Sequence, residues 1–146
     1  MADIYHQIGV NADIETTYQA LTSLDGLSSW WSKATGNTIE GGRLNFHFDD
    51  INIEMSIVQL IPAKKVVWQC TEKGGEWKDT VITFELEQAK GQVFIKFSHK
   101  GWAKQTSLCA HCCTKWAVFM LSLKDYLETG KGQPFPNDVH VNHMHH

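Results

Sequence analysis

The sequence predicts an α+β fold in which a curved antiparallel sheet wraps around one long C-terminal helix. Residues 80–87 and 92–99 alternate between apolar and polar side chains, which is typical of half-buried strands. They lead into an apolar helix at residues 107–128, and Gly130 stands where a left-handed cap is expected. A helix that follows a run of strands must bury its apolar face against their sheet. That face consists of Cys109, Cys113, Trp116, Met120, Leu123 and Leu127.

The elements before this helix predict the rest of the sheet. Residues 4–10 are expected to form a first strand, and Asn11 can cap a short helix that follows it. A second short helix is expected around residues 24–31, after which Gly36 helps to break the chain. Further strands are expected at residues 44–48, 51–57 and 66–68. The predicted order is therefore strand, two short helices, about five antiparallel strands and a long helix.

Length and composition indicate one folded domain. The chain has 146 residues, of which 42% are hydrophobic and 20% are charged, as in an ordinary soluble globular protein. The formal net charge is −3 and Arg43 is the only arginine, so the chain lacks the basic face that a nucleic-acid partner requires. We expect a domain over residues 1–131 and a flexible, histidine-rich tail over residues 132–146.

The sequence also predicts a cytoplasmic protein without a membrane span. Its apolar runs fall short of the roughly 20 residues that cross a bilayer. The first residues contain no basic region followed by an apolar core. The cysteines agree with this compartment, because Cys109, Cys112 and Cys113 crowd into one helical turn instead of forming a spaced disulfide framework.

Short motifs in a fixed order along residues 4–130 carry a family resemblance. These motifs are Ala20-Leu21-Thr22, Trp30-Trp31, Gly41-Gly42-Arg43, the run from Pro62 to Trp68, residues 80–87, His99, and the helix with Trp116, Leu123, Tyr126 and Leu127. They resemble the START-like superfamily (SRPBCC, or birch-pollen-allergen-like proteins), and within it the family of activator of heat-shock-protein-90 ATPase homologues. The resemblance implies a helix-grip fold with two short helices after the first strand. In one departure, Lys115 precedes Trp116, where many relatives have a glycine.

Aromatic side chains are the main candidates for a ligand site. Strand parity places several of them on the concave face of the sheet, where the helix stripe must meet them. The resemblance adds that Trp30 and Trp31 lie near the mouth of the sheet. The alternative is that these side chains simply fill the core. The predicted cavity lining is Trp30, Trp31, Phe46, Phe48, Met55, Trp68, Phe84, Phe97, Trp116 and Met120, with His99 as a polar anchor.

His99 is the only ionisable side chain on the inward face of its strand. A buried neutral imidazole could orient a ligand oxygen or act as a base, or it could be a structural histidine with satisfied hydrogen bonds. No carboxylate pair and no Ser/His/Asp order accompanies it. We therefore name no catalytic residue.

The cysteine cluster and the histidine-rich tail are weaker candidates. Cys109 and Cys112 have the spacing of a redox dithiol near a helix start. Cys109 and Cys113 also lie on the sheet-facing stripe, where thiols behave as small apolar residues, so we expect reduced, structural cysteines. The tail residues His140, His143, His145 and His146 can bind metals adventitiously. We expect no cofactor and no physiological metal site.

Two classes of function remain open. The first is a non-catalytic START-like domain that binds a small hydrophobic molecule, or that docks on a protein partner such as a chaperone. The second, admitted by the resemblance, is an enzyme of the polyketide cyclase type. An apolar cavity with a single polar anchor favours binding, because proton-transfer chemistry requires a positioned acid and base.

Overall fold

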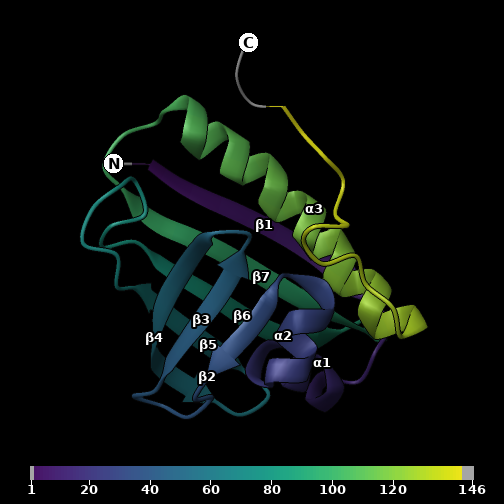
Figure 1. Cartoon of the computed structure of the whole chain (residues 1–146). Coiled ribbons are helices and arrows are strands. Elements are labelled where there is room, and N and C mark those ends of the chain that lie inside the picture. Colours follow the sequence, from purple (N-terminus) through teal and green to yellow (C-terminus); the bar gives the residue numbers. More distant parts are fainter. Residues whose placement is uncertain (1, 143–146) are drawn as a thin grey trace.

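A seven-stranded antiparallel sheet curves around one long helix, as expected for a helix-grip fold (Figure 1). The structure is a computed structural model that describes residues 2–142. The strand order across the sheet is β1-β7-β6-β5-β4-β3-β2. In chain order the elements are β1 (Ala2–Val10), α1 (Ile14–Thr22), α2 (Leu24–Trp30), β2 (Lys33–Gly36), β3 (Arg43–Phe48), β4 (Ile51–Ile61), β5 (Lys65–Cys70), β6 (Val81–Ala89), β7 (Gln92–Trp102) and α3 (Ser107–Thr129).

The first and last strands of the chain are neighbours in the sheet. β1 pairs antiparallel with β7, with Ile8 opposite Ile95 and Val10 opposite Val93. Helices α1 and α2 then carry the chain to the opposite edge, where β2 begins. From β3 onward each strand pairs with the next one along the chain.

The short edge strand β2 was missed by the sequence analysis, which placed a break at Gly36. β2 pairs with β3, with Lys33 opposite His47 and Gly36 opposite Leu44. Four residues are too few to show an alternating pattern, and their partners lie in a later strand. Gly36 allows this pairing, because its φ is +121° and an added Cβ would lie 2.2 Å from the carbonyl oxygen of Arg43.

Side chains at the helix ends define the helix boundaries. The predicted cap of α1 at Asn11 is wrong, because Asp13 Oδ1 accepts the hydrogen bond from Thr16 N–H at 2.7 Å. The Asn11 N–H instead donates to Glu128 Oε2 at 2.8 Å. The expected cap of α3 is confirmed, because Gly130 has a φ of +86° and its N–H bonds to the Tyr126 carbonyl.

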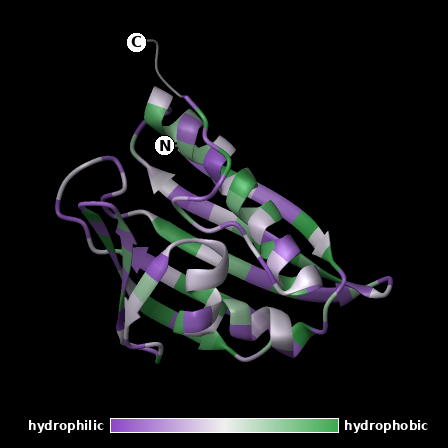
Figure 2. Cartoon of the chain, turned by 45° about the vertical axis from the view of Figure 1, so that its right-hand side comes forward, coloured by the Kyte–Doolittle hydropathy of each residue, from purple (hydrophilic) through white to green (hydrophobic). Residues whose placement is uncertain are grey.

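The core lies between the concave face of the sheet and α3. Figure 2 shows hydrophobic and hydrophilic residues alternating along the strands, as the period-two pattern predicts. On α3, Trp116, Met120 and Leu123 are buried as expected. Phe119 and Ser122 are buried as well, because α2 and the C-terminal segment cover a second side of the helix.

The C-terminal segment, residues 131–142, turns back along α3 (Figure 1). An added Cβ on Gly132 would lie 2.5 Å from the carbonyl oxygen of Ser29, so only glycine fits this crossing. Gln133 N–H donates to Ser122 Oγ at 2.7 Å, and Phe135 N–H donates to the Trp31 carbonyl at 2.7 Å. The segment expected to be a flexible tail thus contacts the domain at several points. His143, His145 and His146 lie outside the described residues.

Candidate functional site

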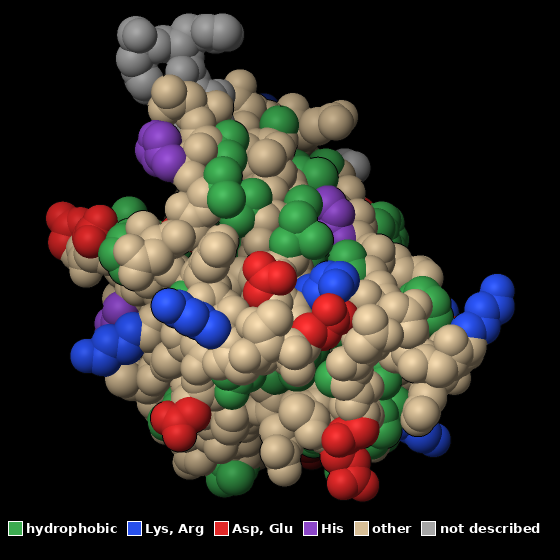
Figure 3. Space-filling model, turned by 90° about the vertical axis from the view of Figure 1, so that its right-hand side faces the viewer, with side chains coloured by type: hydrophobic (Ala, Val, Ile, Leu, Met, Phe, Trp, Pro, Cys, Tyr) green, Lys and Arg blue, Asp and Glu red, His purple; other side chains and the backbone are tan. Residues whose placement is uncertain are grey.

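A cavity of about 830 Å³ opens at one end of the fold. It lies between the first half of α3, the end of β3, the start of β4, the end of α2, the β5–β6 loop and the C-terminal segment. Its size falls within the range of small-molecule sites. In Figure 3, hydrophobic side chains gather in the upper part of the face, while charged side chains lie mainly around its middle and lower parts. The apolar walls are formed chiefly by Trp31, Phe48, Ile53, Trp77, Leu108, Trp116, Phe119 and Phe135.

Three of the predicted ligand-site residues line this cavity, namely Trp31, Phe48 and Trp116. The others lie beneath it and pack against one another, because their aromatic rings fill the centre of the concave sheet. The ring centroids of Trp31 and Phe46 are 4.2 Å apart, and those of Phe97 and Trp116 are 4.5 Å apart. A role for these buried residues in binding stays a prediction. The buried set is Trp30, Phe46, Met55, Trp68, Phe84, Phe97, His99 and Met120.

Several wall residues were missed by the sequence analysis. Ile53 shares the inward parity of Met55, and Phe119 follows Trp116 by three residues on the helix. The spacing of each residue could therefore have predicted that it faces the sheet or the helix. Trp77 lies in the loop after Gly74-Gly75, where periodicity gives no direction. Phe135 belongs to the segment expected to be a tail, and only its contacts with Trp31 and Phe48 place it at the cavity.

His99 forms a directed chain of hydrogen bonds below the cavity wall. Trp116 Nε1–H donates to His99 Nδ1 at 3.1 Å. Because an indole can only donate, the ring proton of the neutral His99 lies on Nε2, which bonds to Thr80 Oγ1 at 2.9 Å. Thr80 Oγ1 in turn donates to the Trp77 carbonyl at 2.6 Å. His99 is fully buried, and this burial lowers its pKa to about 3.

This chain of bonds holds two cavity walls in place. Trp116 comes from α3 and Trp77 from the β5–β6 loop, and their rings stack with centroids 6.2 Å apart. His99 connects both to β7, which lies between β1 and β6 in the sheet. Both ring nitrogens of His99 bond to protein groups, so its geometry is that of a positioning residue for the two tryptophans.

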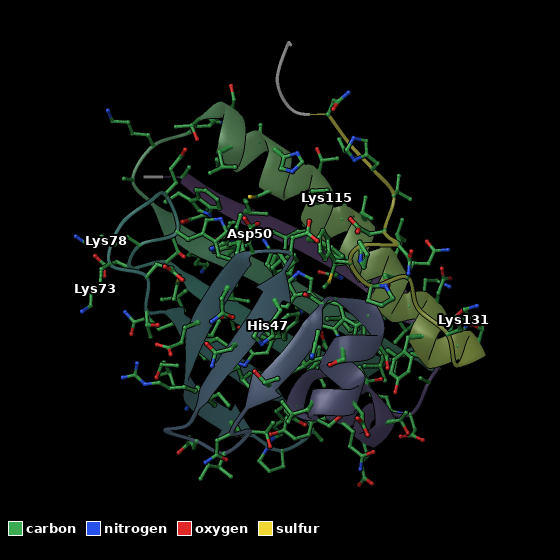
Figure 4. All side chains as sticks on the ribbon, viewed as in Figure 1. His47, Asp50, Lys73, Lys78, Lys115 and Lys131 are labelled. Carbon is green, nitrogen blue, oxygen red and sulfur yellow. The ribbon has the colours of Figure 1, made fainter. Side chains whose placement is uncertain are left out.

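Lys115 and Asp138 form an ion pair at the cavity wall. Only 19% of the Lys115 side chain and 5% of the Asp138 side chain are exposed. Lys115 Nζ also donates to the Val139 carbonyl at 2.8 Å and lies 5.3 Å from the centroid of the Phe119 ring. Figure 4 labels Lys115 on α3, where the C-terminal segment runs beside the helix. The pair therefore fastens this segment to the cavity.

Cys109 and Cys112, near the cavity, are protonated thiols and form no disulfide. Cys112 lines the cavity, and burial raises its pKa to about 11, although a hydrogen bond from Trp77 acts in the opposite direction. Burial likewise raises the pKa of Cys109. All four cysteines of the chain are free. Among residues 2–142, no group of three or more His, Cys, Asp or Glu side chains could hold a metal ion.

Comparisons with known proteins agree with this architecture. The family model described as activator of Hsp90 ATPase homolog 1-like protein matches residues 11–128. The chain is similar to the Aha1 dimer from Colwellia psychrerythraea, with 44% identity over 90% of this chain and 100% of that chain and a TM-score of 0.85. No curated protein matches the chain.

More distant solved structures share the fold. A protein from Staphylococcus saprophyticus is 17% identical over 90% of this chain and 95% of its own, with a TM-score of 0.76. CalU16 from Micromonospora echinospora is 15% identical over 88% of this chain and 77% of its own, with a TM-score of 0.74. In the described part of the chain, no helix has the length and apolar character needed to cross a membrane. On its sequence and its fold, the chain belongs to the START-like family of activator of Hsp90 ATPase homolog 1-like proteins.

Proposed function

We propose that this START-like domain binds a small hydrophobic molecule in the cavity between the sheet, α3 and the C-terminal segment. The single observation that carries the proposal is the cavity of about 830 Å³ with aromatic walls from five parts of the fold. Burying about 200 Å² of apolar ligand surface would contribute about 5 kcal/mol at roughly 25 cal/mol per Å². Part of that gain is offset by the entropy lost on association. The expected cytoplasmic location belongs to the same proposal.

We also propose that the domain releases its ligand unchanged. General acid–base catalysis requires a group that can exchange a proton with the bound molecule. Both nitrogens of His99 are already bonded to Thr80 and Trp116, and its low pKa keeps the ring neutral. The Cys112 thiol is protonated at neutral pH because of its raised pKa. At His99 and Cys112, these features support binding over a reaction of the polyketide cyclase type.

The test combines native mass spectrometry of the freshly purified protein with a screen of apolar compounds. A bound molecule should quench tryptophan fluorescence, because Trp31 and Trp116 line the cavity, and should raise the melting temperature. Ile53→Glu places a charge in the apolar wall and should weaken binding at least tenfold. Val58→Glu is the matched control, because Val58 lies on the same strand, is 51% exposed and does not line the cavity.

The outcomes separate the classes of function. Recovery of the ligand unchanged after prolonged incubation supports binding alone, whereas a chemically altered product supports an enzyme. If the screen gives no shift in melting temperature and no compound co-purifies, the cavity proposal fails. Docking on a protein partner of the chaperone type then becomes the better interpretation of the family membership.

A further inference from the structure

We propose that the ligand is a carboxylic acid with an apolar body, and that its carboxylate replaces the Asp138 carboxylate on Lys115 Nζ. This inference rests on the proposed function and adds the chemical class of the ligand. It follows from two observations. Lys115 lies in an apolar wall, and its present partner, Asp138, belongs to the C-terminal segment.

Lys115 brings a lysine ammonium into the cavity wall. Among the described residues that line the cavity, it is the only lysine or arginine. Lys73 and Lys78 lie on the neighbouring β5–β6 loop, but they are exposed and project away from the protein (Figure 4). The Lys115 ammonium lies beside the ring of Phe119 and is largely shielded from water. A charge in such a position requires a counter-charge, because leaving it unpaired is strongly unfavourable.

Asp138 supplies this counter-charge from a part of the chain outside the family model, which ends at residue 128. Two backbone hydrogen bonds hold residues 135–138. Phe135 N–H donates to the Trp31 carbonyl, and Asn137 N–H donates to the Pro134 carbonyl. Asp138 thus belongs to a segment that lies on the surface of the cavity, and its carboxylate reaches Lys115 from there. We infer that this side chain occupies the place of a ligand carboxylate.

Replacing one carboxylate by another preserves the charge balance at Lys115. A neutral ligand that displaced Asp138 would leave the ammonium unpaired, and a cationic ligand would add a like charge. The remaining acidic groups of the wall have other partners. Glu76 Oε1 accepts a hydrogen bond from Thr106 Oγ1, and Glu72 Oε1 accepts one from Glu54 N–H at 3.4 Å. The position beside Lys115 therefore selects an anionic head group.

The apolar body of the acid would lie against the aromatic wall. Phe119 and Trp116 follow Lys115 on α3, and Trp31 faces both of them, with ring centroids 6.5 Å from Phe119 and 4.8 Å from Trp116. An acid bound at Lys115 would thus have its head at the ion pair and its body on adjacent rings. The ligand class is a monocarboxylate with a mainly hydrocarbon body.

The experiment compares three compounds with the same apolar body: decanoic acid, decan-1-ol and decylamine. Their affinities are measured by calorimetric titration below the concentration at which they form micelles. Wild-type protein should bind the acid more tightly than the alcohol or the amine. Asp138→Asn removes the competing charge with little change in size, and should bind the acid at least tenfold more tightly while the alcohol is unaffected. Lys115→Gln should lose the preference for the acid.

Lys124→Gln is the matched control, because Lys124 lies on α3, pairs with Glu128 and does not line the cavity. It should bind all three compounds as the wild type does. Unchanged affinity for the alcohol shows that a variant keeps its fold and its cavity. An acid preference that survives Lys115→Gln, equal binding of acid and alcohol by Asp138→Asn, or a preference for the amine would overturn the inference but not the proposed function. If none of the three compounds binds while other apolar compounds of the wider screen do, the inference is overturned and the proposed function stands.

Discussion

At the scale of single residues, His99 shows how a side chain can be predicted in place but not in role. Strand parity put its ring on the inward face of β7, and the ring is fully buried. Its partners, Thr80 and Trp116, come from the residue just before β6 and from α3. No spacing within one strand reveals such contacts. The sequence could therefore indicate a buried histidine, but it could not show that both nitrogens bond to protein groups.

The low pKa of His99 predicts a loss of stability in mild acid. The unfolded chain takes up a proton near pH 6.5, whereas the folded chain does not until about pH 3. The contribution of His99 is thus complete above pH 6.5, and it is lost progressively as the pH falls toward 3. Between pH 6 and 4, the free energy of unfolding should fall by up to about 1.4 kcal/mol per pH unit from this residue alone.

Urea unfolding of wild-type protein and His99→Gln across this range measures the effect. For each protein, the free energy of unfolding is plotted against pH. The difference between the two slopes gives the contribution of His99, because the carboxylates titrate in both proteins. The variant should be less stable at pH 7, because Trp116 and Thr80 lose their imidazole partner, but its stability should depend less on pH. Parallel pH dependences for the two proteins would show that His99 is not held neutral.

The raised pKa of Cys112 predicts that its thiol, at the cavity wall, reacts slowly with alkylating reagents. Only the thiolate reacts with iodoacetamide, and a pKa of about 11 leaves very little thiolate at pH 8. Labelling of Cys112 in the native protein should be about 100-fold slower than in urea. Peptide mass spectrometry after timed labelling gives both rates. Equal rates in the two states would revive the redox interpretation of the Cys109/Cys112 spacing.

At the scale of elements, α3 was predictable because its signals are local. Its stripe and its cap at Gly130 lie within one continuous stretch of sequence. β2 was not predictable, because four residues carry no pattern and their pairing depends on β3. The cap of α1 was predictable only in part. Asn11 and Asp13 are both good capping residues, and only the observed start of the helix at Ile14 selects Asp13.

The packing of α3 on the sheet predicts a large difference between two leucines on the same helix. Leu123 is fully buried and Leu121 is 56% exposed. Leu123→Ala should lower the free energy of unfolding by about 2–5 kcal/mol, because it leaves a cavity in the core. Leu121→Ala is the matched control and should change it by less than about 0.5 kcal/mol. Urea unfolding of both variants decides this, and similar values for the two would contradict the packing.

At the scale of the whole molecule, the order of elements predicted the helix-grip fold but not the position of the cavity. Parity placed Phe46, Trp68 and Phe84 on the concave face, and they lie there. These large rings fill the centre of the sheet, and the cavity lies toward one end of it. The wall that closes this space includes Phe135 and Asp138. That segment carries no periodic signal, and its path depends on Gly132 and on contacts with two helices.

The path of the C-terminal segment predicts that Ser122 controls its attachment. Ser122 Oγ donates to the Trp30 carbonyl at 2.9 Å and accepts from Gln133 N–H at 2.7 Å. Ser122→Ala removes both bonds in a buried position, and should lower the free energy of unfolding by about 1–3 kcal/mol. The amide hydrogens of Gln133 and Phe135 should exchange faster with solvent. Hydrogen exchange measures this, with the exposed Thr114→Ala on the same helix as the control.

The pairing of β1 with β7 has a consequence for how the chain folds. Residues 2–10 cannot form their strand pairs until residues 93–102 have been synthesised, and the helix that covers the sheet is synthesised after all the strands. During synthesis, the strands that emerge first have unpaired backbone groups at their edges, and their aromatic side chains are exposed to water. A sheet in which the first strand of the chain pairs with the last has many contacts between distant parts of the sequence, which slows folding and leaves unfinished chains prone to aggregation. Truncations before Trp102 should therefore accumulate as insoluble protein, although they contain most of the strands.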